Sequence, residues 1–330
     1  MDANDSIRNP KSEIRHLFLG VDGGQSSTTA LIGDETGRVL GAGRGGPCNH
    51  IGAAEGAAKL TRAVEECVSK ACEQAHLDPR QIRYEAACFG MSGGPDDKES
   101  LLSQILPAEK LVVTHDGLIA LSGATAGEPG IIVIAGTGSF AFGRNGAGEA
   151  RRAGGWGYIF GDEGSGFDIT RQALRAALRF EEGWGPPTAL RETLLQASGA
   201  PDANGALHLF YTREFPRSRV ASFARLVDQA AVDGDQVAIH ILNNAAQHLA
   251  SLTASIRRQL WKEGESVRVA YIGGVFHSKL ILERYCQLVE MQDGNRCQPP
   301  EYGPAAGALL EAYRAAGLHP KLTGLLSSED

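Results

Sequence analysis

Two short glycine-rich segments carry the residue types that bind phosphate. The first, Asp22-Gly23-Gly24-Gln25-Ser26-Ser27-Thr28, combines two glycines with three hydroxyl side chains, and Gly136-Thr137-Gly138-Ser139 offers the same chemistry further along. Glycine lets a backbone approach a ligand closely, and successive N–H groups form a concave anion site. One such segment is usually only a turn, so the phosphate prediction depends on two of them at equivalent places in two similar halves.

An acid lies at the end of a predicted strand. Residues 111–114 are an apolar run that we expect to be a strand buried on both faces, and it leads into His115 and Asp116. The carboxyl ends of such strands open into the crevice where α/β folds bind ligands. Asp116 is therefore the predicted catalytic group, whereas we expect His115 to be structural.

Two further glycine patterns do not indicate a dinucleotide site. Residues 41–46 match G-x-G-x-x-G and residues 136–141 match G-x-G-x-x-A. That fingerprint requires a helix directly after the turn. Gly138 is followed by a strand and the hairpin signal Asn145-Gly146, and Gly43 by a loop containing proline, so NAD binding is excluded. The P-loop pattern G-x-x-x-x-G-K-[ST] is absent.

The predicted elements repeat in order, which indicates a diverged duplication. In the first half, short strands with tight turns precede alternating helices and strands, at residues 17–21, 28–33, 38–43, 53–75, 84–91, 98–106 and 111–114. The second half repeats this with a long helical region, at residues 131–135, 139–143, 166–261, 267–272, 279–291 and 304–316. The fold class is therefore α/β with two similar halves.

Length and composition narrow the function classes. A chain of 330 residues favours two domains, and a net charge of −7 argues against a nucleic-acid partner. We expect the basic pairs Arg151-Arg152 and Arg257-Arg258 to be solvated surface.

No apolar stretch approaches the roughly 20 residues of a membrane helix, and no signal peptide is evident, so we expect no membrane partner and a cytoplasmic location. The six cysteines form no C-x-x-C pair, which favours neither zinc nor a disulfide framework.

The ordered motifs resemble those of a known superfamily. Asp22-Gly23-Gly24, His115-Asp116-Gly117, Ala135-Gly136-Thr137-Gly138-Ser139 and Gly273-Gly274-Val275-Phe276 look like the phosphate and adenosine motifs of the actin-like ATPases. The stretch Gly154-Gly155-Trp156-Gly157-Tyr158-Ile159-Phe160-Gly161-Asp162-Glu163-Gly164-Ser165 resembles the signature of the N-acetylglucosamine kinase branch of the BadF/BadG/BcrA/BcrD ATPases. Pro47-Cys48-Asn49-His50 and Met91-Ser92-Gly93-Gly94 resemble further sugar-side motifs of that branch.

The resemblance implies a duplicated ribonuclease-H-like fold with two domains around a cleft. We expect a loose tail at 1–13, an N-terminal domain at 14–117 and a C-terminal domain at 118–330 with a helical insertion. The boundary region is 117–130, where glycine and alanine are dense. The last helix, about 304–317, would pack on the first domain.

The resemblance also implies ATP and Mg²⁺ as cofactors and an amino sugar, most simply N-acetylglucosamine, as substrate. Asp116 would be the general base, and Asp22 would orient Mg²⁺ through water. The remaining roles are sugar contacts at Asn49, Ser92, Gly155 and Asp162, and ATP contacts at Gly24, Ser26, Thr137, Gly138, Gly273, Gly274 and Ala306, with Gly307 beside it.

Several alternatives stay open on the sequence. Many relatives have a third glycine, a threonine and a lysine where this chain has Gln25-Ser26-Ser27, which puts the details of phosphate neutralisation in doubt. Taken singly, Asn49 is a turn former, Trp156 a core residue, and Asp162 a helix-capping acid. A rival function is an ATPase that activates a radical 2-hydroxyacyl-CoA dehydratase. Glucosamine, N-acetylmuramic acid and N-acetylmannosamine are alternative substrates, and a homodimer is an open alternative to a monomer.

Overall fold

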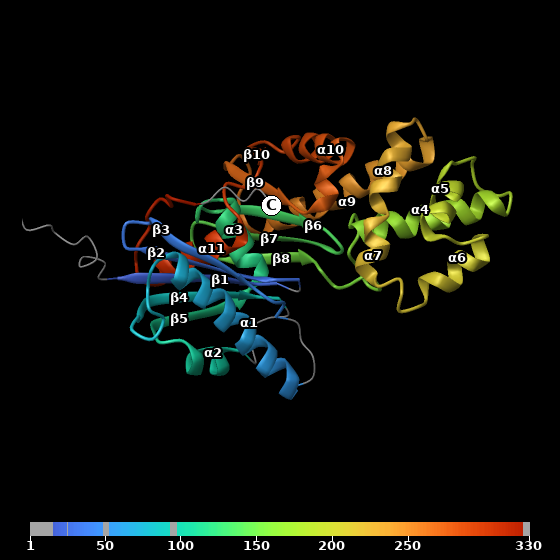
Figure 1. The fold of residues 1–330 in the computed structure, drawn as a ribbon. Coiled ribbons are helices and arrows are strands. Elements are labelled where there is room, and N and C mark those ends of the chain that lie inside the picture. The colour runs from blue at the N-terminus through green and yellow to red at the C-terminus, as the bar shows by residue number, and fades with distance from the viewer. Residues whose placement is uncertain (1–15, 25, 49–52, 93–97, 326–330) are drawn as a thin grey trace, which may run out of the picture. The chain divides into compact units, whose positions relative to one another are not determined.

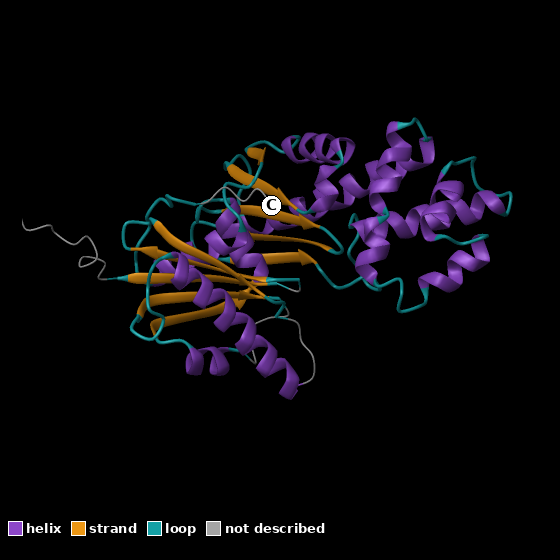
Figure 2. Ribbon diagram, in the orientation of Figure 1, coloured by secondary structure: helices purple, strands orange, loops and turns teal. Residues whose placement is uncertain are grey.

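The chain forms two compact units, each built on its own five-stranded sheet (Figures 1 and 2). The computed structural model describes residues 16–24, 26–48, 53–92 and 98–325. Residues 1–127 with 301–330 form the first unit, and residues 128–300 form the second. No helix among the described residues is long and apolar enough to cross a membrane.

The first unit has the strand order β3-β2-β1-β4-β5. β1 pairs antiparallel with β2 and parallel with β4, and β5 continues the parallel side. The elements of this unit are β1 (Leu17–Gly23), β2 (Thr28–Asp34), β3 (Val39–Gly45), α1 (Ala53–Gln74), β4 (Tyr84–Met91), α2 (Glu99–Ile105), β5 (Ala108–His115), α3 (Asp116–Ala124) and α11 (Pro304–Ala315).

Helices cover both faces of this sheet, so side chains alternate between two cores. Leu19 and Val21 of β1 face the core that α1 closes, whereas Phe18 packs on Tyr313 of α11, with ring centroids 4.4 Å apart. Gly20 marks where α11 crosses β1, because a Cβ there would lie 2.1 Å from a backbone nitrogen. The last helix of the chain is therefore a structural part of the first unit.

The second unit repeats the sheet, with the order β10-β9-β6-β7-β8. β6 pairs antiparallel with β7 and parallel with β9, as β1 does with β2 and β4. Its elements are β6 (Gly130–Ala135), β7 (Ser139–Arg144), β8 (Ala150–Gly154), α4 (Gly166–Glu181), α5 (Leu190–Ser198), α6 (Ala203–Phe210), α7 (Arg217–Ser222), α8 (Ala224–Val232), α9 (Gln236–Leu260), β9 (Val267–Ile272), the 3₁₀ turn η2 (Gly274–His277), α10 (Lys279–Glu290) and β10 (Asn295–Gln298).

The matching strand orders confirm the duplication that the sequence predicts. The long helix α9 covers the second sheet, where Leu242, Leu249 and Ile256 enter one continuous core with β6. Helices α4 to α8 are inserted between β8 and α9 and form the helical part of this unit, at the right of Figure 1.

Two sequence expectations are wrong, and one open alternative, a core position for Trp156, is excluded. β5 is the edge strand of its sheet, so most of its residues are only half-buried rather than buried on both faces. Arg257 is not solvated surface. It is 1% exposed, because its guanidinium donates to the carbonyls of Lys262 and Glu265 (2.8 Å each) and to Oδ1 of Asn295 (3.1 Å). Trp156 is 76% exposed and not a core residue.

The glycine- and alanine-rich stretch expected as a domain boundary begins with a helix. α3 is buried along most of its length and packs on α11 in the first unit. A Cβ at Gly307 would lie 1.8 Å from the carbonyl oxygen of Ile119, and one at Gly123 would lie 2.3 Å from that of Gly303. Small residues here allow two helices to touch, so the chain leaves the first unit after residue 127 rather than after 117.

Candidate functional site

The first glycine turn joins β1 to β2. The amide of Gly24 donates to the carbonyl of Ser27 (3.1 Å), and the carbonyl of Gly24 accepts from the amide of Cys48 (3.1 Å). The Thr28 hydroxyl donates to the carbonyl of Gly46 (2.7 Å), which ties the turn to the end of β3. Ser26 is exposed on this turn, so its hydroxyl is accessible to a ligand.

Two carboxylates lie at the carboxyl ends of two parallel strands of the first sheet. Asp22 precedes the end of β1, and Asp116 follows the end of β5, with β4 between them. Ser92 follows β4, where its amide donates to the carbonyl of Gly23 (3.1 Å) and its hydroxyl donates to Oδ2 of Asp116 (3.1 Å). The sheet therefore gathers three of the predicted site residues, Asp22, Ser92 and Asp116, at one edge.

The electrostatics of this edge distinguish Asp22. Its burial, reinforced by the negative charge of Asp116, raises the pKa of Asp22 from 3.8 to about 6. A cation bound beside Asp22 would offset this unfavourable negative charge, and carboxylate oxygen is the ligand type that Mg²⁺ prefers. The pair thus suits a magnesium ion held partly by water and phosphate oxygens. The described residues contain no cluster of three or more His, Cys, Asp or Glu side chains that would hold a metal by protein alone.

His115 orients the start of α3, as its predicted structural role requires. Its Nδ1 accepts a hydrogen bond from the amide of Leu118 (3.3 Å), so His115 is the N-cap of the helix and Asp116 is its first residue. Asp116 therefore lies at the positive end of the α3 helix dipole.

The second glycine turn joins β6 to β7. The amide of Gly136 donates to the carbonyl of Gly138 (2.9 Å), and the carbonyl of Gly136 accepts from the amide of Gly166 at the start of α4 (2.8 Å). A Cβ at Gly138 would lie 2.9 Å from the guanidinium of Arg217 and from the carboxylate of Asp162. Glycine at 138 therefore leaves room for a partly buried ion pair directly behind the turn.

That ion pair connects two predicted ligand segments. Asp162 is 4% exposed; Oδ1 accepts from the amide of Ser139 (3.3 Å), and Oδ2 is bound by the Arg217 guanidinium. Arg217 also donates to the carbonyl of Thr137 (3.4 Å). The amide of Gly155 donates to the carbonyl of Ser139 (3.0 Å). Thr137, Gly138, Gly155 and Asp162 thus lie together around β7.

Asp162 does not cap the helix that follows it. The Ser165 hydroxyl is the N-cap of α4 and accepts from the amide of Asp168 (3.2 Å). Asp162 itself has a φ of +62°, a left-handed conformation that is strained for most residues and that functional sites often contain. Its carboxylate is committed to Ser139 and Arg217, so Asp162 shapes this segment.

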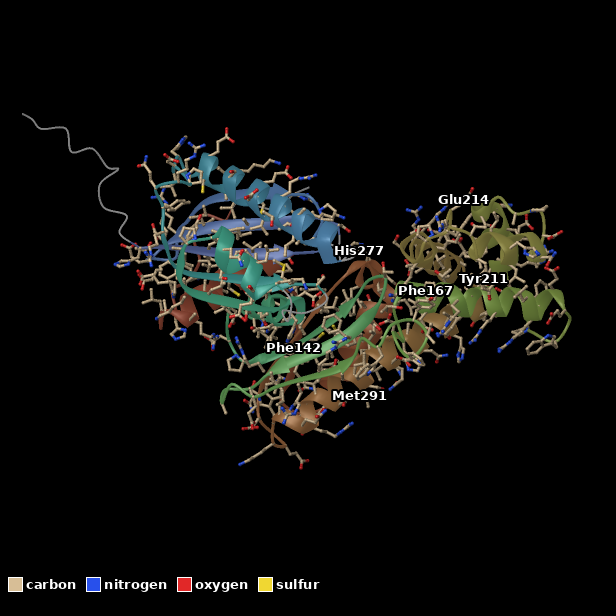
Figure 3. The ribbon with its side chains drawn as sticks, turned by 90° about the horizontal axis from the view of Figure 1, so that it is seen from below. Phe142, Phe167, Tyr211, Glu214, His277 and Met291 are labelled. Carbon is tan, nitrogen blue, oxygen red and sulfur yellow. The ribbon has the colours of Figure 1, made fainter. Side chains whose placement is uncertain are left out.

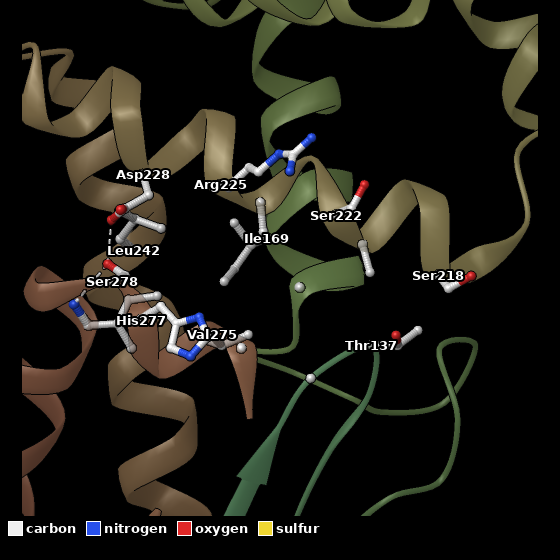
Figure 4. Close-up of a pocket in the computed structure, with 16 residues that line it drawn as sticks. Thr137, Ile169, Ser218, Ser222, Arg225, Asp228, Leu242, Val275, His277 and Ser278 are labelled. Carbon is white, nitrogen blue, oxygen red and sulfur yellow. Dashed lines mark hydrogen bonds between the residues drawn. The ribbon is translucent and has the colours of Figure 1, made fainter. Parts of the chain in front are cut away.

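A cavity of about 420 Å³ opens beside the second turn (Figure 4). Gly136 and Thr137 form one wall, and Gly274 with Val275 another, while Arg225 reaches in from α8. The Ser278 hydroxyl donates to Oδ1 of Asp228, which joins η2 to α8 across the cavity. The remaining lining residues are Gly166, Ile169, Ser218, Ala221, Ser222, Ala224, Leu242, His277 and Ile281. This volume falls in the range of small-molecule pockets, about 300–1,000 Å³.

Gly273 makes this wall possible. Its φ of +115° is accessible only to glycine at low energy, and a Cβ there would lie 2.2 Å from the carbonyl oxygen of Ala135 at the end of β6. Gly274 follows it with open space beside its Cα. The double glycine therefore lets the chain turn away from β9 tightly against β6 and present backbone to the cavity.

Other predicted residues lie elsewhere. Ala306 and Gly307 belong to α11 in the first unit, where Ala306 is buried in the core with Phe18, and neither residue lines the cavity beside Thr137. Asn49 lies outside the described residues. The sequence reasoning missed Arg217, Arg225 and Asp228, because an exposed-looking helical residue gives no signal of the turn it reaches in the fold.

The two repeated sheets, each with a glycine turn after its first strand, define an actin-like ATPase. A family model matches residues 19–312. The chain belongs to the BadF/BadG/BcrA/BcrD ATPase family.

Relatives of this chain are named as sugar kinases. The chain is 31% identical over 278 residues to an N-acetylmuramic acid/N-acetylglucosamine kinase of Clostridium acetobutylicum, covering 79% of this chain and 85% of the relative. It is 29% identical to an N-acetyl-D-glucosamine kinase of Dictyostelium discoideum, covering 81% and 88%. A solved structure from Chromobacterium violaceum, described as a candidate N-acetylglucosamine kinase, is 28% identical with a TM-score of 0.70, covering 89% and 98%.

Proposed function

We propose that this protein transfers the terminal phosphate of ATP to the 6-hydroxyl of an amino sugar, with N-acetylglucosamine as the leading substrate. The observation that carries the proposal is the Asp116 carboxylate, which accepts a hydrogen bond from Ser92 and lies beside the half-buried Asp22. Relatives that align over most of the chain and act on N-acetylated amino sugars support this substrate class.

Asp116 is the proposed general base. Phosphoryl transfer depends mainly on positioning and on charge stabilisation, and a carboxylate within hydrogen-bond reach of the attacking hydroxyl accepts its proton. The α3 N-terminus and the Ser92 hydroxyl fix the orientation of this carboxylate.

Asp22 is the proposed magnesium-orienting residue, acting through water. Bound Mg²⁺ would neutralise charge on the phosphate oxygens. The pKa of Asp22, raised by burial and by Asp116, fits a carboxylate that is ionised when a cation lies nearby.

The second unit is the proposed binding site for ATP. Thr137 and Gly138 would donate to the phosphates, with Gly24 and Ser26 of the first unit as their counterparts. The purine nucleoside would occupy the cavity lined by Gly274 and Arg225, with Gly273 shaping its wall. Ala306 of α11 stays a proposed contact of ATP, although it does not line that cavity.

The proposed sugar contacts are Asn49 and Ser92 of the first unit with Gly155 and Asp162 of the second. Asp162 is held by Arg217, which favours a shared, oriented carboxylate over a mobile one. Glucosamine, N-acetylmuramic acid and N-acetylmannosamine remain alternative substrates, and the oligomeric state is not part of the proposal.

A sugar panel in a coupled ADP-release assay tests the proposal. ADP release should rise many-fold with N-acetylglucosamine, should require Mg²⁺, and should yield the 6-phosphate by mass and NMR analysis. If no hexose or amino sugar stimulates ADP release, the kinase proposal is wrong. A dehydratase-activating ATPase would instead contain iron and a brown colour after anaerobic purification, which separates the two functions.

A further inference from the structure

A second and larger cavity lies in the helical part of the second unit. Its volume is about 700 Å³, and it runs between α4, α5, α6 and α7. We call it the helical groove; its lining includes Leu174, Arg175, Leu178, Leu194, Leu207 and Tyr211. Figure 3 labels Tyr211 and Phe167, which both line it. It shares no lining residue with the cavity beside Thr137.

The helical groove concentrates exposed apolar surface. The described residues expose twelve large hydrophobic side chains, and five of them line this groove: Tyr158, Ile159, Leu178, Leu207 and Tyr211. Tyr211 is 85% exposed and Ile159 is 68% exposed. Clustered apolar surface of this kind, unlike scattered single residues, marks a binding site.

The lining of the helical groove carries more basic than acidic side chains, whereas the whole chain has a net charge of −7. Four arginines line the groove, at positions 171, 175, 191 and 217, against one acid, Glu181. Three of them are paired: Arg171 with Asp168 (2.6 Å), Arg191 with Glu181 (2.8 Å) and Arg217 with Asp162. The Arg175 side chain forms neither a hydrogen bond nor an ion pair with any residue that the structure describes.

Apolar walls and one unpaired cation select a particular ligand. Leu174 and Leu178 lie four residues apart on α4, as do Arg171 and Arg175, so both sets face the same groove. We infer that the helical groove binds a carboxylate with an apolar acyl chain, whose charged end meets Arg175 and whose chain lies on Leu174, Leu178 and Leu207. The volume suits a small molecule, since such sites measure about 300–1,000 Å³.

This ligand chemistry has two sources. The carboxylate could be a free acyl acid, or an acyl acid joined to an amino sugar. The second source arises because Tyr158 and Ile159 line the groove and belong to residues 154–165, the segment with the proposed sugar contacts Gly155 and Asp162. The binding site itself does not depend on the kinase proposal.

Calorimetry with short acids tests the site. Hexanoate, octanoate and decanoate should bind with one site per chain, and affinity should rise about threefold to fourfold per methylene, as burial of apolar chain requires. Octylammonium, which has the same chain and the opposite charge, should bind at least about tenfold more weakly than octanoate. Equal binding of the two, or no binding of decanoate, would overturn the proposal.

Matched variants locate the site. Arg175→Gln should weaken octanoate binding about twofold to fivefold, as exposed ion pairs do, and should reduce the preference over octylammonium by the same factor. Leu178→Asp should abolish binding, whereas Val232→Asp, at a 74% exposed position outside the groove, should not change it. Unchanged binding in Leu178→Asp would place the acid elsewhere and refute the assignment.

Competition distinguishes the sources. If the ligand is a free acid, octanoate should bind equally well with and without saturating N-acetylglucosamine. If it is sugar-borne, glucosamine carrying a 7-carboxyheptanoyl group on its nitrogen should compete with both octanoate and N-acetylglucosamine, and Arg175→Gln should weaken that competitor selectively. A failed kinase assay with intact octanoate binding would reject the kinase proposal and leave the groove assignment standing.

Discussion

The two units carry the same sheet but opposite chemistry at equivalent strand ends. In the first unit, the ends of β1, β4 and β5 bring Asp22, Ser92 and Asp116 together. In the second unit, the equivalent ends of β6 and β9 bring Gly136 and Gly273 together, with a Cβ at Gly273 excluded by the Ala135 carbonyl. The two copies of the fold therefore differ in the residues at these strand ends. The first unit has carboxylate side chains there, and the second has glycines beside a cavity.

Under the proposed function, the two units would contribute different groups to the reaction. Carboxylates are needed where a proton is accepted and a cation is oriented, while close approach of backbone is needed where phosphates and a nucleoside are held. The second unit also keeps its acid, Asp162, paired with Arg217, so that acid is already neutralised. Variants that exchange these properties would break the comparison.

Asp116→Asn should have the largest effect. Asn keeps the shape and accepts a hydrogen bond, but it cannot take up the proton of the attacking hydroxyl. We expect kcat to fall by about 10²- to 10⁴-fold with little change in KM, measured by ADP release under saturating sugar. Asp162→Asn, the matched change in the second unit, should lower kcat far less. Equal losses in the two variants would mean that acid chemistry is not confined to the first unit.

Gly273→Ala should come next. The φ of +115° and the 2.2 Å approach to Ala135 leave no room for a methyl group, so we expect the free energy of unfolding to fall by about 2–4 kcal/mol in urea denaturation. Gly274→Ala is the control, because its Cβ would meet nothing within 4 Å; it should leave stability unchanged and weaken ATP binding. A stable Gly273→Ala protein would contradict the described geometry of β9 and β6.

Asp22→Asn should alter stability with pH. The pKa of Asp22 is about 6 in the folded protein and 3.8 in the unfolded chain. Between these values the folded state holds a proton that the unfolded state has lost, so the wild-type protein loses stability as the pH rises from about 4 to about 6. Asn stays neutral, so the variant should be more stable than wild type above pH 6, by on the order of 2–3 kcal/mol. The difference should vanish below pH 4.

Thermal unfolding at pH 4 and at pH 7.5, without Mg²⁺, measures the effect of Asp22→Asn. The variant should also need more Mg²⁺ for half-maximal turnover. Identical stability of variant and wild type at pH 7.5 would show that Asp22 is not destabilised by its burial and by Asp116.

Thr137→Val and Ser26→Ala should have the smallest effects and compare the two turns directly. Each substitution removes one hydroxyl without disturbing a described backbone contact. The loss of one hydrogen bond to a charged phosphate should lower the affinity for ATP about tenfold. Calorimetry should show similar ATP losses in both variants and unchanged sugar affinity. A loss in only one of them would mean that one turn alone contacts the nucleotide.

Most of the fold follows from local sequence pattern. The order of elements, the hairpin after Arg144 and the long helix ending near Trp261 are predictable because strand and helix periodicities are local. The errors occur where packing overrides composition. α3 is helical because its glycines fit against α11, and β10 is a short strand only because β9 offers it an edge.

Cysteine chemistry shows the same limit. The spacing of the six cysteines indicates no pair, yet the thiols of Cys286 on α10 and Cys297 on β10 interact, and that contact lowers the pKa of Cys286. Sequence spacing is informative when ligands share one turn or helix. It fails when two separate elements supply the partners.

The sequence by itself determined the duplication, the two glycine turns and the strand-end acid Asp116, because each is encoded within a few consecutive residues. Only the tertiary structure decided that Arg217 reaches both Thr137 and Asp162, that Arg225 and Asp228 border the cavity, and that α4 and α6 form a groove around Arg175. These contacts join residues far apart in the chain. Their geometry depends on how whole helices pack, which no local pattern records.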